Sequence, residues 1–267
     1  MILLCALLGL LVGAFINLCA DQLPRSRRLT RTPFCPYCNQ PRPWWAWIGT
    51  VAYLAFKPNC RQCGAPISWR HPLTELVIAL LFAFIWQRYG VTVYLPLYSV
   101  YSAIFVLVVV IDLEHRLILN VVIYPAWALA LVGSLLRPEP VHFWRMALIG
   151  GALGYGLLFV IYKFGELFVR VMSKARGRDI NAVAFGYGDV RLGGFIGLVL
   201  GFADVFQALF LGVLLGGLGG LVYWFLRAIV LRRYSLFTAI PYGPFLVAGA
   251  MAMLFFGPEI TRWWMGG

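Results

Sequence analysis

The chain carries the sequence GYGDVRL at residues 186–192, which sets Asp189 beside glycines at the start of an apolar run. A second aspartate, Asp112, ends another apolar run 77 residues earlier. A carboxylate costs about 2.5–3.5 kcal/mol at the centre of a bilayer and less near its surface. Each aspartate alone has an ordinary explanation, Asp189 as a helix cap and Asp112 as a solvated helix end. Two such sites in one apolar chain favour a functional role for the pair.

The composition around these sites is that of an integral membrane protein. Of the 267 residues, 62% are hydrophobic and 12% are charged, and the mean hydropathy is +0.84. A soluble domain does not carry so little charge. The net charge of +12 comes from Lys and Arg residues that are spread between apolar segments. That distribution encodes membrane topology and argues against nucleic-acid binding.

Eight apolar segments predict an all-α polytopic fold with about eight transmembrane helices. They cover residues 1–20, 73–87, 91–111, 117–136, 146–166, 190–201, 205–226 and 240–257. The first could be a cleaved signal peptide. Its positive charges follow the apolar run instead of preceding it, so a retained helix fits better.

The distribution of basic residues predicts the orientation of these helices. Eighteen of the 22 Lys and Arg residues fall in the loops at 21–72, 112–116, 163–191 and 227–239, and four fall on the other side. Cytoplasmic loops carry such an excess. We therefore expect both termini outside and both Asp112 and Asp189 at the cytoplasmic face.

Residues 21–72 predict a small zinc-ribbon-like insertion. They hold the pair Cys35 and Cys38 and, after 21 intervening residues, the pair Cys60 and Cys63. Each pair precedes a residue that tolerates a left-handed backbone, Asn39 or Gly64, as a tight turn around one ion requires. This spacing favours a structural zinc site with four cysteine ligands, and two disulfides are the rival interpretation. Cys5 and Cys19 are interpreted as small apolar residues.

Other motifs have simpler explanations. Asn17, in the first apolar segment, predicts a hydrogen bond between helices. The glycines at 150–156 and 212–220 predict close helix packing rather than nucleotide binding. The sequence has no HExxH pair for a metalloprotease and no GxSxG elbow for a serine nucleophile.

In combination, these motifs give the chain a resemblance to the bacterial type IV prepilin peptidase family. It rests on GAFIN at 13–17 before LP at 23–24, the two CxxC pairs, PIS at 66–68, PLTEL at 72–76, DLE at 112–114, GYGDVRL at 186–192 and PYGPFL at 241–246. The resemblance runs along nearly the whole chain.

The resemblance implies a polytopic aspartic peptidase that removes the basic leader of type IV prepilins and pseudopilins at the cytoplasmic face of the bacterial inner membrane. As in many members, it also implies N-methylation of the new N-terminal residue with S-adenosylmethionine; a peptidase without this second activity is the alternative. Asp112 and Asp189 would be the catalytic pair, with Gly186 and Gly188 allowing close approach of the substrate backbone and a positive φ. Membrane lipid would be the surrounding partner.

The implied organisation is a first helix at 1–20, a four-cysteine segment at 21–72 and a peptidase core at 73–267. Two other functions remain open at this point. A transporter could use paired carboxylates for ions, although such sites tend to lie near the bilayer midplane. A zinc-binding membrane adaptor would explain the cysteines but not the glycines beside Asp189.

Overall fold

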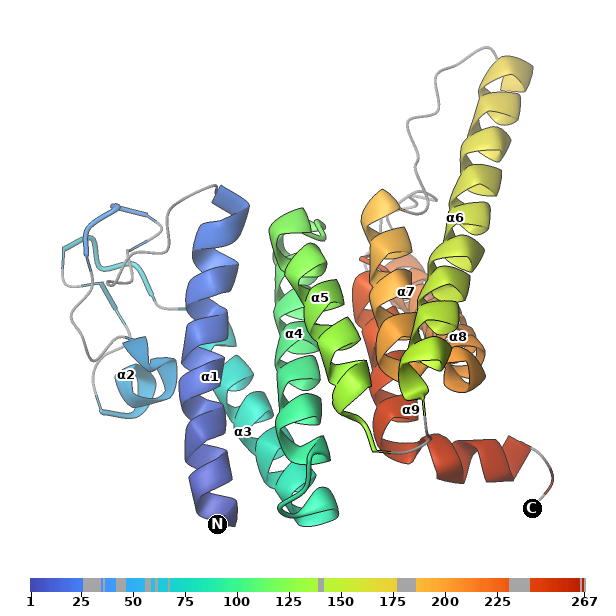
Figure 1. The fold of residues 1–267 in the computed structure, drawn as a ribbon. Coiled ribbons are helices and arrows are strands. Elements are labelled where there is room, and N and C mark those ends of the chain that lie inside the picture. Colours follow the sequence, from blue (N-terminus) through green and yellow to red (C-terminus); the bar gives the residue numbers. More distant parts are fainter. Residues whose placement is uncertain are drawn as a thin grey trace. The chain divides into compact units, whose positions relative to one another are not determined.

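A computed structural model describes residues 1–25, 35, 37–41, 47–55, 59–60, 62–66, 68–138, 142–176, 186–230, 241–264 and 266. The elements in these ranges are helical (Figure 1). They are α1 (Ile2–Gln22), the 3₁₀ helix η1 (Leu23–Arg25), α2 (Gly49–Ala55), α3 (Arg70–Tyr89), α4 (Tyr94–His115), α5 (Asn120–Leu136), α6 (Phe143–Arg176), α7 (Tyr187–Leu200), α8 (Phe202–Val230) and α9 (Gly243–Trp264).

Six of these helices are long and apolar enough to cross a membrane, and α5 is a shorter apolar helix of 17 residues. The multi-pass helical fold predicted from the sequence is therefore present. Helix α7 has only 14 residues, so eight transmembrane crossings stay a prediction. Much of the segment 21–72, and the basic residues at 177–185 and 231–240, lie outside the described residues.

Several helix boundaries differ from the prediction. Helix α6 continues to Arg176, so about half of the predicted loop at 163–191 belongs to this helix. Helix α9 continues past residue 257 to Trp264, with a kink at Phe256 (Figure 1). Pro258 explains the kink, because its ring removes a backbone donor inside the helix.

The chain forms two compact units, Met1–His115 and Arg116–Gly267, which are described here one at a time. The predicted functional division at residues 20 and 72 is a separate matter and stays a prediction.

In the first unit, α1 and α3 pack through glycines and one buried amide. A Cβ on Gly9 would lie 2.7 Å from the Ala79 Cα, and one on Gly13 would lie 2.6 Å from the Glu75 Cα. The Asn17 side chain then donates to the His71 carbonyl at 3.0 Å. The predicted hydrogen bond between helices at Asn17 is confirmed.

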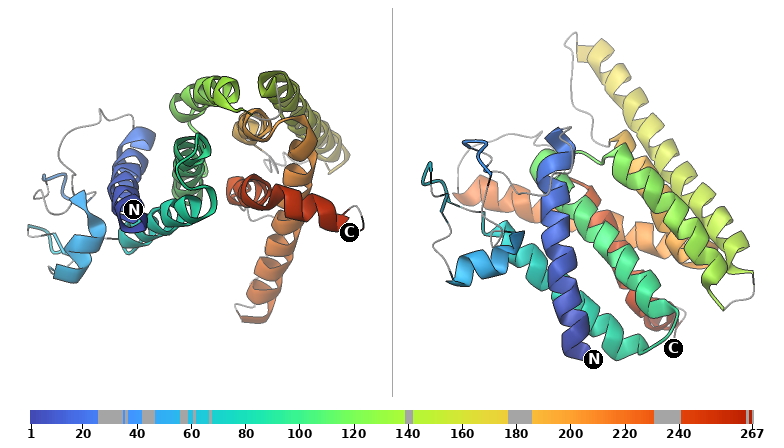
Figure 2. Two further views of the ribbon diagram at one scale, coloured as in Figure 1. Left: turned by 60° about the horizontal axis from the view of Figure 1, so that its bottom comes forward. Right: turned by 60° about the vertical axis from the view of Figure 1, so that its left-hand side comes forward.

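In the second unit, α6 and α7 run antiparallel in close contact (Figure 2). A Cβ on Gly197 would lie 2.0 Å from the Gly150 carbonyl oxygen, and one on Gly154 would lie 2.3 Å from the Gly193 carbonyl oxygen. Helix α8 packs on α9 in the same way, with Gly249 against Ala208. Small residues let helix backbones approach closely in a membrane. The predicted packing role is therefore confirmed for Gly150 and Gly154, whereas Gly156 has nothing within 4 Å of its Cβ.

The connection between α7 and α8 is a tight turn. Gly201 has φ 82° and joins Leu200 directly to Phe202. A residue with a side chain is strained in that backbone conformation.

We predict that Gly154→Ala destabilises the second unit by about 1–3 kcal/mol, because an added methyl group overpacks the contact with α7. Gly156→Ala, two residues along the same helix, has nothing within 4 Å of its Cβ and should be neutral or stabilising by up to about 1 kcal/mol. Thermal unfolding in detergent measures the difference. Equal melting temperatures for both variants would contradict the packing role.

Candidate active site and metal centre

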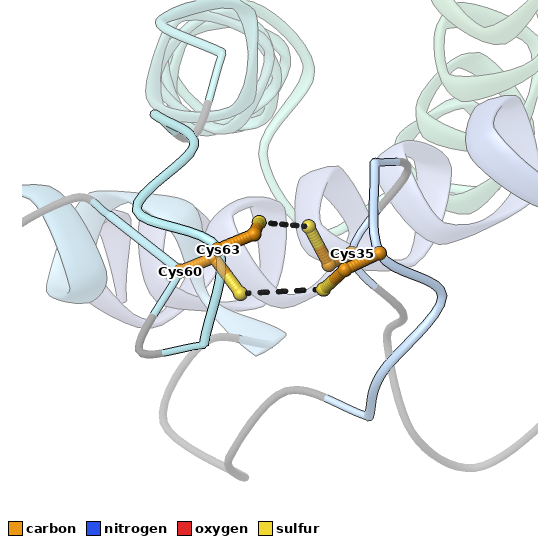
Figure 3. A group of neighbouring side chains, drawn as sticks. Cys35, Cys60 and Cys63 are labelled. Atoms are coloured by element: carbon orange, nitrogen blue, oxygen red, sulfur yellow. Dashed lines mark hydrogen bonds between the residues drawn. The ribbon is translucent and has the colours of Figure 1, made fainter.

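The four predicted cysteine ligands come together in one cluster (Figure 3). The Sγ atoms of Cys35 and Cys63 lie 3.6 Å apart, those of Cys38 and Cys60 lie 3.7 Å apart, and all four fall within 4.8 Å of one another. All six cysteines of the chain are free thiols, so the structure does not contain the two disulfides of the rival interpretation. A tetrahedron of sulfurs around Zn²⁺ has edges of about 3.8 Å. The cluster therefore has the dimensions of a four-thiolate metal site.

Two similar backbone turns build this cluster. In the first, the Cys35 N–H donates to Gln40 and Asn39 returns an N–H to Cys35, with φ 57° at Asn39. In the second, the Cys60 N–H donates to the carbonyl of the residue after Gly64, and Gly64 has φ 70°. The left-handed residues that the sequence predicts after each pair are both present.

The turns also set the charge of the sulfurs. Burial opposes ionisation of Cys35, but two backbone N–H groups of its own turn and the sulfurs of Cys38 and Cys63 lower its pKa to about 6. Two backbone N–H groups likewise lower the pKa of Cys60. At Cys38 a backbone N–H acts in the same direction, yet burial and the neighbouring sulfurs raise its pKa to about 12. Four thiolates so close together need a cation among them.

A buried carboxylate ties the short helix α2 to the membrane helices. Glu75, on α3, is 0% exposed. Its oxygens accept the backbone N–H groups of Gly49 at 2.6 Å and Thr50 at 2.8 Å, and Asn17 of α1 lies 3.4 Å away. Because α2 lies between the two cysteine pairs in the chain, Glu75 fixes part of the cysteine segment to α1 and α3.

One turn earlier on α3, Arg70 links three helices by ion pairs. Its guanidinium pairs with Asp21 of α1 and with Glu114 of α4, each at 2.5 Å. His71 approaches the second oxygen of Asp21 at 3.1 Å. Glu114 therefore lies in the last turn of α4 and carries a partner, whereas the sequence suggested a free position in the loop.

Asp112 lies two residues before Glu114 in the same helix and is 5% exposed. The interpretation of Asp112 as a solvated helix end is therefore wrong. Helix α4 ends three residues later, where Arg116 adopts φ 53°. The carboxylate is buried within one turn of the helix terminus.

Asp189 is 8% exposed and lies in the first turn of α7, since that helix begins at Tyr187 and not at Val190 as predicted. Its carboxylate accepts the Gly186 N–H at 3.0 Å, so the capping role that the sequence allowed is real. A carboxylate there is favoured by the helix dipole.

The two glycines beside Asp189 do not have the positive φ that the sequence suggested. Gly186 has φ −85°, and Gly188 is helical. Gly188 instead makes room for a neighbour, because a Cβ there would lie 2.8 Å from the Ile118 Cβ.

Comparisons with known proteins give two family matches. The description "Bacterial Peptidase A24 N-terminal domain" fits residues 7–89, which include Asn17, Glu75 and all four clustered cysteines. The description "Type IV leader peptidase family" fits residues 99–221, which include Asp112 and Asp189. The chain belongs to the type IV leader peptidase family. It is therefore an enzyme of the peptidase class.

Individual relatives match this chain over nearly its whole length. A prepilin leader peptidase/N-methyltransferase of Bacillus subtilis is 27% identical and covers 96% of this chain and 95% of its own length. Proteins of that same name from Pseudomonas aeruginosa and Aeromonas salmonicida are 28% and 29% identical and cover 96% and 97% of this chain, with 90% and 92% of their own lengths. No solved structure gives a match.

Sequence reasoning missed what Glu75 and Arg70 do in this leader peptidase. A signal was available for Glu75, because it is a lone acid in the apolar run PLTELVIALL. An ionisable residue inside a membrane segment indicates a buried partner or a functional site. Nothing local identified Gly49 and Thr50 as the partners, since they lie on a separate short helix.

We predict that Glu75→Ala loosens α2, because two backbone N–H groups lose their buried acceptor at a cost of about 1–3 kcal/mol. Hydrogen exchange at residues 49–55 should accelerate. Thr74→Val is the matched control, because the Thr74 hydroxyl bonds only to the Arg70 carbonyl of its own helix. Exchange in Glu75→Ala as slow as in the wild type would show that this carboxylate does not anchor α2.

Proposed function

We propose that this chain is an aspartic endopeptidase that cleaves the basic leader of type IV prepilins or pseudopilins, with Asp112 and Asp189 as its catalytic pair. The observation that carries the proposal is the match of residues 99–221 to the leader peptidase family. Both aspartates lie inside that match, and both are buried at the end of a helix that begins or finishes beside them.

Two carboxyl groups supply the chemistry that peptide hydrolysis requires. When they lie a few ångströms apart they share one proton, because two adjacent negative charges cannot both form at low cost. The ionised group removes a proton from water, which attacks the scissile carbonyl. The protonated group polarises the carbonyl oxygen and then protonates the leaving amine. No acyl-enzyme forms, and the protonation states belong to the pair.

Ile118 packs on Gly188, the neighbour of Asp189. Gly188 therefore supports the pair by accepting Ile118, and Gly186 by presenting its N–H to Asp189. We assign both glycines to the substrate-facing edge of the site.

The orientation follows from the distribution of charge. The excess of Lys and Arg on the side of Asp112 and Asp189 supports a site at the cytoplasmic face, with both termini outside. Leader peptides that carry basic residues remain on that face for the same reason.

We predict that Asp112→Asn and Asp189→Asn each lower leader cleavage by at least about 10²–10⁴-fold, because the amide keeps the size of the side chain and removes its titrating proton. The measurement is the mass of a model prepilin after incubation with purified enzyme in detergent. Full cleavage by either variant would exclude this pair.

Two other carboxylates serve as controls. Asp204→Asn changes the first turn of α8, and Glu166→Gln changes an ion-paired residue on α6. Both variants should keep most of the activity. Glu114→Gln is a poorer control, because it breaks the ion pair with Arg70.

The cysteine cluster is proposed to bind one structural zinc ion through Cys35, Cys38, Cys60 and Cys63. The sulfur spacing, the two lowered thiol pKa values and the paired turns support this choice of metal. The names of the relatives support a second activity, methylation of the new N-terminus with S-adenosylmethionine as the donor of the methyl group. The cysteine segment is proposed to help hold that donor and the cleaved end.

We predict that Cys35→Ser loses most of the bound zinc, since oxygen replaces one thiolate ligand. Methylation should fall before cleavage does, which mass spectrometry resolves as loss of the leader without the added methyl group. Cys5→Ser, outside the cluster, should keep zinc and both activities. Reduced, active enzyme without zinc would refute the metal assignment, and equal loss of both activities would indicate general unfolding instead of a role in methylation.

A further inference from the structure

A groove of about 550 Å³ lies between α5, α6 and α7 in the second unit. These three helices lie side by side (Figure 2). Nothing in the proposed peptidase reaction uses this groove. Its lining residues on α7 are Tyr187, Arg191, Gly194 and Leu198, which recur every three or four residues and so form one face of the helix. Asp189 is two residues from Tyr187 and lies on the opposite face.

One end of the groove is polar. The guanidinium of Arg191 lies 4.5 Å from the centre of the Tyr187 ring and 5.7 Å from that of Tyr124. The hydroxyl groups of Tyr155 and Tyr187 are hydrogen-bonded at 2.5 Å. Arg191 also donates to the neutral side chain of Asn120. A cation and two hydroxyl groups thus gather at one end of the groove.

The other end of the groove is apolar. Leu131 of α5, Leu148 of α6 and Leu198 of α7 line it, and the first two are 36% and 47% exposed. Gly151 and Gly194 line the intervening stretch, where Gly151 packs against Leu198 and Gly194 against Trp127. The groove therefore changes from aromatic and cationic to aliphatic along the helix axes.

Among the described residues of this unit, no carboxylate lies within ion-pair distance of the Arg191 guanidinium. Two basic residues on α6 do have an acidic partner, because Lys163 and Arg170 both form ion pairs with Glu166. The groove therefore offers one cation to an anionic partner.

We propose that this groove binds one anionic phospholipid. The phosphate group lies at Arg191 and the tyrosine hydroxyls, and an acyl chain follows Gly151 and Gly194 toward the three leucines. A guanidinium binds phosphate oxygens through charge-assisted hydrogen bonds, and basic pockets between membrane helices bind anionic headgroups. The aliphatic end excludes a nucleotide, whose base and sugar need polar partners. The groove faces away from Asp189, which disfavours the peptide substrate as its occupant.

The experiment is native mass spectrometry of the detergent-solubilised Asp189→Asn protein with phosphatidylglycerol or phosphatidylcholine. Because this variant is tested for binding alone, failure of the peptidase proposal leaves the result intact. We expect phosphatidylglycerol to bind at least about tenfold more tightly than phosphatidylcholine. Arg191→Gln should remove that preference, as loss of one hydrogen bond to a charged group implies. Lys163→Gln, which removes a neutralised charge, should retain the preference.

A second variant tests the groove itself without changing any charge. Ala152 lines the groove, and Ala152→Trp should abolish binding of phosphatidylglycerol by filling the space. Leu157→Trp adds an indole ring to an exposed position on α6 outside the groove and should bind as the parent does. Equal binding of the two lipids by the parent, or undiminished binding by both Arg191→Gln and Ala152→Trp, would overturn the proposal. Displacement of the lipid by an apolar prepilin helix would assign the groove to the substrate instead.

Discussion

The free-energy cost of moving a carboxylate from water to a site beside hydrocarbon determines where the polar groups of this protein lie. Glu75 is fully buried, and it is stable there because two backbone N–H groups of α2 donate to it. Asp189 satisfies part of the same requirement with the Gly186 N–H. An ionised group without such partners would lose several kcal/mol on leaving water. Glu75 and Asp189 therefore lie where a helix begins and free N–H donors are available, Glu75 beside the start of α2 and Asp189 at the start of α7.

The same cost explains the architecture of the first unit. Arg70 and Glu75 lie about one turn apart on α3 and bind partners on α1, α2 and α4. The apolar faces alone would let these helices slide, because lipid is as apolar as leucine. Polar pairs have one geometry, so they fix the register in which α1, α3 and α4 pack. They also connect that register to the cysteine segment.

Local sequence patterns correctly predicted those backbone conformations that depend on residues adjacent in the chain. The turns after Cys38 and Cys63 needed Asn39 and Gly64 in a left-handed conformation, and the structure has both. The same reasoning failed at Gly186 and Gly188, where glycine has a different use. Gly188 accommodates Ile118, a contact between residues 70 positions apart that no local pattern encodes. The partners of Glu75 and Arg70 escaped prediction for this reason.

The predicted helix boundaries were wrong where a helix extends beyond its apolar segment. The 34 residues of α6 correspond to about 51 Å, whereas the hydrocarbon layer is about 30 Å thick. Arg145 and Lys163 on this helix are 18 residues, or about 27 Å, apart. That spacing matches the thickness of the hydrocarbon layer, so in a bilayer a shift of α6 along the membrane normal would draw one of the two charges into lipid. Because glycines let the backbones of α6 and α7 pack closely, α7 shares that fixed depth. Helix α6 therefore fixes the depth of Asp189 in the membrane.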